Sequence, residues 1–195
     1  MDAGLAVGLE PVELLVAGEN VSAELFASVS GLPHPSRRIA VFRRDELPRL
    51  DASAPPEVGL ALWHVGDPGN VGTILRCADA LGPAFVTLSA GCADPTGPKA
   101  LRASMGAVFR VPVGAFEEAP WRRVALVAHG GVPLREYELS EPVTFVLGAE
   151  REGLPDSVVR GCESRVSIPL EPRAESLNVA VAAAIALHER RRSAG

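Results

Sequence analysis

A chain of 195 residues with 47% hydrophobic and 22% charged residues is expected to form a soluble globular domain with a full core, with room for a small N-terminal appendage. The net charge of −5 argues against a protein that coats nucleic acid, and the longest apolar run, Val179–Leu187, is too short to span a bilayer. The three cysteines and four histidines lack metal-ligand spacing, and no signal peptide is recognisable. We therefore expect a cytoplasmic protein without a metal or a membrane partner.

The first 57 residues are expected to form a short N-terminal segment. Strands are predicted at Val12–Val16 and Ile39–Phe42, with a helix at Ser22–Ser30 whose N-cap is Ser22. The stretch Asp51–Glu57 is rich in Pro, Ala and Ser and predicts a linker. The second part of the chain, 58–195, begins after it.

From residue 58 onward, apolar runs typical of buried strands alternate with helical patterns. The expected strands lie near Val58–Val65, Ala84–Leu88, Val124–Ala128, Thr144–Leu147 and Val166–Ile168. The expected helices lie near Val71–Leu81, Lys99–Met105 and Ser176–Arg191. This alternation predicts an α/β fold with a mostly parallel sheet and helices on both faces.

The loop after the first of these strands combines glycines with a polar helix start. Asn70 stands where a helix N-cap is expected, and Arg76 follows about one and a half turns into the helix. A helix that starts after a glycine-rich loop attracts anions. The GxxGxxG spacing differs from the GxGxxG of dinucleotide-binding proteins, and no acid ends the next strand. Arg76 could bind an anion or form a surface salt bridge.

Two later loops have the same design. Glu150 lies between Gly148 and Gly153 after a buried strand, which by spacing alone could be an ordinary exposed turn. Ser176 is a candidate N-cap for the last helix, and Asn178 needs polar partners because that helix is apolar nearly all round. Such a helix is buried either inside the domain or against a second copy of the chain. Loops of this kind at the carboxyl ends of strands are where α/β proteins bind ligands.

These three segments together resemble the TrmH/SpoU-type RNA ribose methyltransferases of the SPOUT superfamily. The matching stretches are NVGTILRCADALG (70–82), FVLGAEREGL (145–154) and IPLEPRAESLNVAVAAAIALHE (168–189). The resemblance covers about Gly59 to Arg190. A fourth stretch, Asp94–Val113, resembles members that act on ribosomal RNA more than those that act on tRNA.

The resemblance implies a fold, a cofactor and an assembly. The fold is an α/β sheet whose C-terminal segment forms a deep trefoil knot, and a homodimer completes the site. The cofactor is S-adenosylmethionine. The implied cofactor-binding residues are Leu147, Gly148, Glu150, Gly153, Ile168, Leu170, Ser176, Leu177 and Asn178. The implied catalytic set is Asn70, Arg76, Glu150, Ser176 and Asn178.

The implied reaction is methylation of a ribose 2′-hydroxyl in RNA, with rRNA favoured over tRNA. Arginine side chains are poor bases, so we expect Arg76 to grip the phosphate beside the target ribose and orient the hydroxyl. The N-terminal segment is shorter than the RNA-binding domain of longer family members and is interpreted as a reduced RNA-binding region. The alternatives are a non-catalytic RNA-binding module with this fold, and a methyltransferase that acts on a base or a small molecule.

Overall fold

The computed structural model describes residues 2–30 and 37–193, and the chain divides into two compact units, Met1–Leu47 and Pro48–Gly195. Residues of the expected linker region belong to the second unit. Leu50 donates a backbone hydrogen bond to Val113, and Val113 donates one to Pro48. The role of the N-terminal segment in RNA binding stays a prediction.

The first unit is a small assembly of short elements. Its elements are α1 (Asp2–Ala6), β1 (Glu13–Val16), α2 (Ala23–Ser30), β2 (Arg38–Val41) and η1 (Arg44–Glu46), the last a 3₁₀ turn. The strands β1 and β2 pair antiparallel, and Phe26 of α2 is buried. The hydroxyl of Ser22 accepts a hydrogen bond from Leu25 N at 3.2 Å, which confirms Ser22 as the cap of α2.

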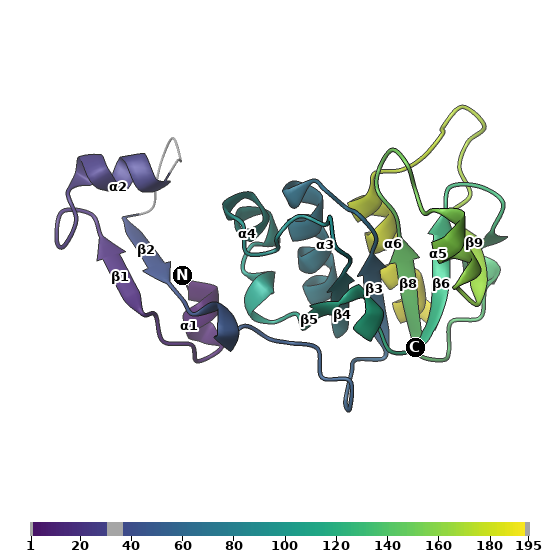
Figure 1. Ribbon diagram of the computed structural model, residues 1–195, viewed down its shortest axis with the longest axis horizontal. Coiled ribbons are helices and arrows are strands. Elements are labelled where there is room, and N and C mark those ends of the chain that lie inside the picture. Colours follow the sequence, from purple (N-terminus) through teal and green to yellow (C-terminus); the bar gives the residue numbers. More distant parts are fainter. Residues whose placement is uncertain (1, 31–36, 194–195) are drawn as a thin grey trace. The chain divides into compact units, whose positions relative to one another are not determined.

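The second unit is built on a seven-stranded sheet in the order β5-β4-β3-β8-β6-β9-β7, and all its neighbouring strands run parallel (Figure 1). Its strands are β3 (Val58–Leu62), β4 (Ala84–Leu88), β5 (Val113–Ala115), β6 (Arg122–Val127), β7 (Val132–Pro133), β8 (Val143–Leu147) and β9 (Ser164–Ser167). Its helices are α3 (Pro68–Leu81), α4 (Pro98–Ser104), α5 (Asp156–Arg160) and α6 (Val179–Ser193), with 3₁₀ turns η2 (Ala107–Phe109), η3 (Phe116–Glu118) and η4 (Leu134–Glu136).

The central strands are buried on both faces, which is why β3 and β8 read as continuous apolar runs. On one face, α3 and α6 lie next to each other and supply Ile74, Leu75, Ala183 and Leu187 to the larger core. On the other face, Phe85 and Phe116 centre a smaller core that is partly covered by Val158 of α5. The expectation of a mostly parallel sheet with helices on both faces is confirmed.

The sheet order places a topological switch at β3. The chain moves from β3 to β4 and β5 in one direction, and β8 and β6 then occupy the other side of β3. Ligands of open α/β sheets bind beyond the carboxyl ends of the strands at such a switch point. The elements β5, β7 and α1 were not predicted, because they have only two to five residues and show no periodic pattern.

Candidate functional site

Three loops meet at the carboxyl edge of the sheet, at the switch point. They follow β3, β8 and β9, and each contains residues of one of the three motif segments. The edge is tied together at the strand ends, where Trp63 N donates to Leu147 O at 2.8 Å. Residues far apart in the chain are thereby brought to one place, as the parallel order requires.

The start of α3 is fixed by Asp67. One carboxylate oxygen of Asp67 accepts hydrogen bonds from the backbone nitrogens of Gly69 at 2.6 Å and Asn70 at 3.1 Å, and Pro68 is the first helical residue. The expectation that Asn70 is the N-cap was therefore wrong, because the helix begins one turn earlier than the sequence pattern indicated. As a result, the Asn70 side chain is released from capping and is available for other contacts.

Lys99 of α4 braces this cap from the outside. Its ammonium group lies 2.8 Å from the other carboxylate oxygen of Asp67. The hydrogen bond from Lys99, followed by that from the Asn70 backbone, lowers the pKa of Asp67 below its usual value. The cap is therefore ionised, and stays bound to both α3 and α4, at neutral pH.

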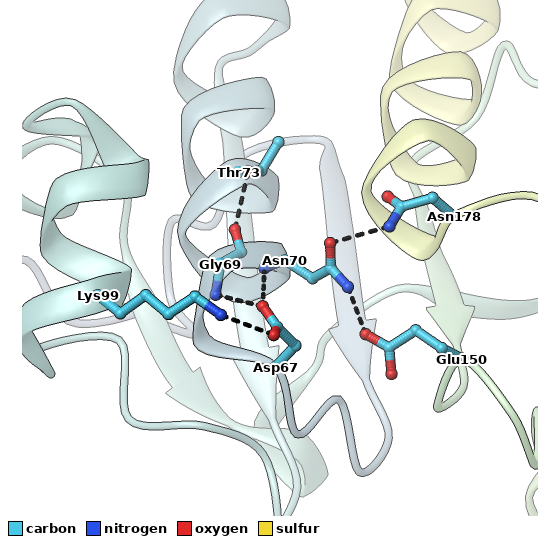
Figure 2. A network of polar contacts seen from close by, with 7 residues as sticks. All are labelled: Asp67, Gly69, Asn70, Thr73, Lys99, Glu150 and Asn178. Carbon is cyan, nitrogen blue, oxygen red and sulfur yellow. Dashed lines mark hydrogen bonds and ion pairs between the residues drawn. The ribbon is translucent and has the colours of Figure 1, made fainter.

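Asn70 links the three loops (Figure 2). Its amide nitrogen donates to a carboxylate oxygen of Glu150 at 2.5 Å, and its amide oxygen accepts from the side-chain nitrogen of Asn178 at 3.0 Å. A single carboxamide thus satisfies an acceptor from the loop after β8 and a donor at the start of α6. These three residues are 80 and 108 positions apart in the two pairings, so the fold alone brings them together.

The start of α6 is capped by Asn178. Its side-chain oxygen accepts from the backbone nitrogens of Ala180 at 2.9 Å and Val181 at 3.3 Å. The expectation that Ser176 is the N-cap was wrong, because the helix begins at Val179 and only Asn178 is placed to reach its first free N–H groups. The polar partners that Asn178 was expected to need are Asn70 and this helix start.

A cavity of about 600 Å³ lies beside this network, between the ends of β6 and β8 and the chain that leads into α6. It is lined by Leu126, Val127, Ala128, Leu147, Gly148, Ala149, Glu150, Arg151, Glu152, Gly153, Ile168, Leu170, Glu175, Ser176, Leu177, Val179 and Ala182. Aliphatic side chains alternate there with three carboxylates and one guanidinium. Such a lining suits a ligand with a flat apolar part and charged groups of both signs.

Gly148 and Gly153 allow the loop after β8 to fold back tightly. Gly153 N donates to Ala149 O at 2.9 Å, and Gly153 has a positive φ of 67°. A Cβ atom on Gly148 would overlap the backbone of Gly153. The loop therefore needs glycine at position 148 to form the wall of the cavity.

The sequence-predicted residues fall into three groups. Those that line the 600 Å³ cavity are Leu147, Gly148, Glu150, Gly153, Ile168, Leu170, Ser176 and Leu177. Asn70 and Asn178 lie outside this lining but reach it through Glu150. Arg76 is an exposed residue of α3 and is not part of the lining. On a regular helix it stands roughly 9 Å further along the axis than Asn70 and is rotated about 120° away.

A second, mainly apolar cavity of about 500 Å³ lies between the exposed sides of α3 and α6. It is lined by Asn70, Thr73, Cys77, Leu81, Asn178, Ala180, Val181, Ala184, Ile185 and His188. Burial raises the pKa of the Cys77 thiol, and the neighbouring Arg76 acts in the opposite direction. The last helix is thus buried on its sheet side, while Val181 on this other side is 48% exposed.

Several residues of the site escaped sequence reasoning. Asp67 was hidden by the expectation that Asn70 caps α3, although an acid before Pro-Gly is itself a cap signal. Lys99 carries no sequence signal, because its partner is 32 positions away. Leu126–Ala128 were expected as the end of a strand, but their place in the cavity depends on the insertion of β6 between β8 and β9.

Two further findings concern the described part of the chain. Within residues 2–30 and 37–193, no group of three or more His, Cys, Asp or Glu side chains is arranged to hold a metal ion. None of the helices described has the length and apolar character needed to span a bilayer.

Comparison with known proteins gives consistent relatives. A family model described as the SpoU rRNA Methylase family matches residues 57–188. An uncharacterised tRNA/rRNA methyltransferase of Synechocystis is 35% identical over 88% of this chain and 66% of its own length. The 23S rRNA (guanosine(2553)-2′-O)-methyltransferase RlmP of Bacillus subtilis is 33% identical over 88% of this chain and 71% of its own length. The chain thus spans about two thirds of these curated relatives.

Solved structures show the same fold. The AdoMet-bound rRNA methyltransferase from Sinorhizobium meliloti superposes with a TM-score of 0.86 at 28% identity, covering 98% of this chain and 85% of that one. The likeness extends over both compact units of the chain, because it covers nearly all residues.

Proposed function

Because the chain belongs to the SpoU rRNA Methylase family, we propose that it is an S-adenosylmethionine-dependent RNA methyltransferase that modifies a ribose 2′-hydroxyl. The observation that carries the proposal is the hydrogen-bonded group of Asn70, Glu150 and Asn178 at the edge of the 600 Å³ cavity. Three motif segments converge there, and each contributes one polar side chain.

The residues of the large cavity fit S-adenosylmethionine. Leu126, Leu147 and Ile168 offer apolar walls for an adenine ring. Glu150, Glu152 and Glu175 are anionic and suit a sulfonium and an ammonium group, while Arg151 suits a carboxylate. When bound, the cofactor supplies a methyl group that is already activated by the positive sulfur. The protein then mainly has to align the acceptor and exclude water.

Glu150 lines the cavity, and Asn70, which lies outside the lining, holds it by a hydrogen bond. The hydrogen bond from Asn70 holds one oxygen of Glu150, which leaves the second oxygen able to accept from a ribose hydroxyl or a neighbouring cation. Asn178 keeps the Asn70 carboxamide in the orientation that makes this bond. Ser176, in the same lining, can hydrogen-bond the ribose or the cofactor.

Arg76 acts on the RNA rather than on the cofactor in this proposal. It is absent from the cavity lining and exposed on α3, which suits a guanidinium that binds the phosphate next to the target ribose. We place it at the cavity of a second subunit. The second, mainly apolar cavity between α3 and α6 supports such a homodimer, since it exposes Val181 beside Ile185 and Leu81.

The names of the relatives support a choice of RNA class and of cellular setting. RlmP of Bacillus subtilis is named as a 23S rRNA methyltransferase, and we propose rRNA over tRNA as the substrate, in the cytoplasm. The N-terminal unit would contribute reduced RNA contacts. The trefoil knot stays a prediction for the segment between β9 and α6.

The proposal is tested by methyl transfer. The purified chain is incubated with S-adenosylmethionine labelled in its methyl group and with ribosomal RNA, and the RNA is digested to nucleosides. We expect the label in a 2′-O-methylated nucleoside. Arg76→Ala should abolish transfer while cofactor affinity changes less than about twofold, and label in a base or in no RNA at all would contradict the proposal.

The dimer has a matched test in two valines of equal exposure. Val181 in the second cavity is 48% exposed and Val132 of β7 is 47% exposed. Val181→Glu should give a monomer by sedimentation and lose methyl transfer, whereas Val132→Glu should stay dimeric and active. A monomeric wild-type chain that methylates RNA would refute the shared site.

A further inference from the structure

An aromatic pair stands at the carboxyl end of β3, outside both cavities. The rings of Trp63 and His64 are stacked, with centroids 4.8 Å apart and planes 4° from parallel. Trp63 is half-buried and His64 is exposed. Among the hydrogen bonds and ion pairs of the described residues none involves the His64 imidazole, whose ring contacts are the stack on Trp63 and the neighbouring Gly91.

The His64 backbone adopts a conformation that costs free energy. Its φ is 53°, in the left-handed region where non-glycine residues are uncommon. Neighbouring groups hold this conformation, since His64 N donates to the Ser89 hydroxyl at 2.9 Å and Trp63 N donates to the Leu147 carbonyl at 2.8 Å. Strain that the neighbours hold in place is a feature of functional sites.

Contacts with Phe116 and Arg123 also hold the Trp63 ring in place. The Trp63 ring meets the buried Phe116 edge-on at 5.1 Å, and the Arg123 guanidinium lies 5.2 Å over the same Phe116 ring. Arg123 in turn donates to the carbonyls of Phe116 and Glu117 at 3.1 Å. Trp63 therefore rests on a rigid support, and little side-chain freedom remains to be lost when a ligand stacks on the pair.

The position of the pair connects it with the proposed site. Trp63 N donates a hydrogen bond to the carbonyl of Leu147, and the next residue, Gly148, lines the large cavity. His64 precedes by three residues Asp67, the cap of the helix that carries Asn70. Two cationic side chains lie nearby: Lys99 of α4 pairs with Asp67, and Arg151 of the loop after β8 lines the large cavity.

We propose that Trp63 and His64 form a stacking platform for a nucleobase of single-stranded RNA that flanks the target ribose. This rests on the proposed function, which brings an RNA ribose to Glu150. Single-stranded RNA is recognised by stacking of unpaired bases on Trp and His rings, with nearby cations on the phosphates. The platform would set how the strand lies across the carboxyl edge, and would select an unpaired rather than a helical substrate.

The binding test uses tryptophan fluorescence. Trp63 and Trp121 are the two tryptophans of the chain, so Trp121→Phe leaves Trp63 as the sole reporter. Titration with a short single-stranded RNA oligonucleotide of mixed sequence should quench Trp63. His64→Gly removes the ring and relieves the backbone, and His64→Asn keeps a residue that tolerates a positive φ. Both should weaken RNA binding by about tenfold.

Controls separate the platform from a structural stack and from the proposed function. The melting temperature of His64→Gly should be unchanged or raised, because glycine relieves the backbone. Its affinity for S-adenosylmethionine should be unchanged. Unchanged RNA affinity in both variants, or no quenching of Trp63, would overturn the platform. Methyl transfer by the wild type would still support the proposed function in that case. Quenching with weakened binding in both variants supports the platform even where no methyl group is transferred, a result that would count against the function alone.

Discussion

The two helices that frame the site begin in different ways. The start of α3 is held by Asp67, which accepts two backbone hydrogen bonds and pairs with Lys99. The chain that approaches α6, residues 168–177, is mostly exposed, and within residues 169–177 of the described chain a single backbone hydrogen bond joins Ala174 N to Glu171 O. The start of α3 is one wall of the site, and contacts within the protein hold it in place. Residues 168–177 are the other wall, and a bound ligand can order them.

The difference between the two walls indicates that the site is rigid at Asn70. Asn70 sits on the fixed wall and is the point to which Glu150 and Asn178 are attached. Asn70 therefore holds Glu150 and Asn178 in one arrangement at the edge of the cavity. Preorganisation on the side of the acceptor is what a reaction with an activated donor requires.

The largest effect is expected from a methyl group added to the loop after β8, which we propose contacts the cofactor. Gly148→Ala would overlap the backbone of Gly153 and displace the loop, whereas a Cβ on Gly66, in the loop before α3, meets nothing within 4 Å. We expect Gly148→Ala to weaken S-adenosylmethionine binding by about 100-fold, or about 2.7 kcal/mol, by calorimetry. Gly66→Ala should bind within about twofold of wild type. Equal affinities in the two variants would remove the loop after β8 from the cofactor site.

Next in size is the loss of the cap of α6. Asn178→Ala removes two hydrogen bonds to the helix start and the bond to Asn70, so we expect about 1 kcal/mol of destabilisation, or a melting temperature lower by about 2–4 °C. Ser176→Ala removes no cap and should melt with the wild type. Should Ser176→Ala be the less stable variant, the assignment of the cap is wrong.

A smaller effect is expected from the brace on α3. The pair of Lys99 and Asp67 is exposed, with side-chain exposures of 58% and 47%, and such pairs contribute about 0.2–1 kcal/mol. Lys99→Met should lower the efficiency of methyl transfer two- to fivefold, by about that energy, and leave cofactor affinity unchanged. Lys99→Arg keeps the charge and should retain most of the rate. A loss of cofactor affinity in Lys99→Met would show that the two walls are not independent.

The smallest effect is expected in the pH dependence of the melting temperature. The pKa of Asp67 is lowered in the folded chain, chiefly by the Lys99 hydrogen bond, so its cap stabilises the fold at pH values above the unfolded value of about 4 and is lost as the pH falls through the lower folded value. Asp67→Asn does not titrate. Between about pH 6 and pH 3 the wild type should therefore lose slightly more melting temperature than Asp67→Asn. Parallel losses would mean that the cap does not depend on ionisation.

Much of the fold followed from the sequence because its cause is local. The apolar runs at Val58–Leu62 and Val143–Leu147 are buried on both sides, and a run of that kind predicts a central parallel strand. Short elements such as β5 and β7 are held by pairing with strands far along the chain, and their two or three residues carry no period.

The site was predictable as a set of loops but not as a network. Asn70, Glu150 and Asn178 could be picked out as polar residues at strand ends. Their mutual bonds depend on the order β3-β8-β6-β9, which no local pattern encodes. The two helix caps were misplaced by three residues or fewer, because Asp67, Asn70, Ser176 and Asn178 are all good capping residues and the helix start decides among them.

The most direct test of the central claim is amide hydrogen exchange of the wild-type chain with and without S-adenosylmethionine. We expect the cofactor to slow exchange at residues 148–153 and 168–177, while the amides of Gly69 and Asn70, already hydrogen-bonded to Asp67, change little. Unchanged exchange in both loops, or protection that appears elsewhere in the chain, would contradict a site in which one preformed wall and one ligand-ordered wall meet at Asn70.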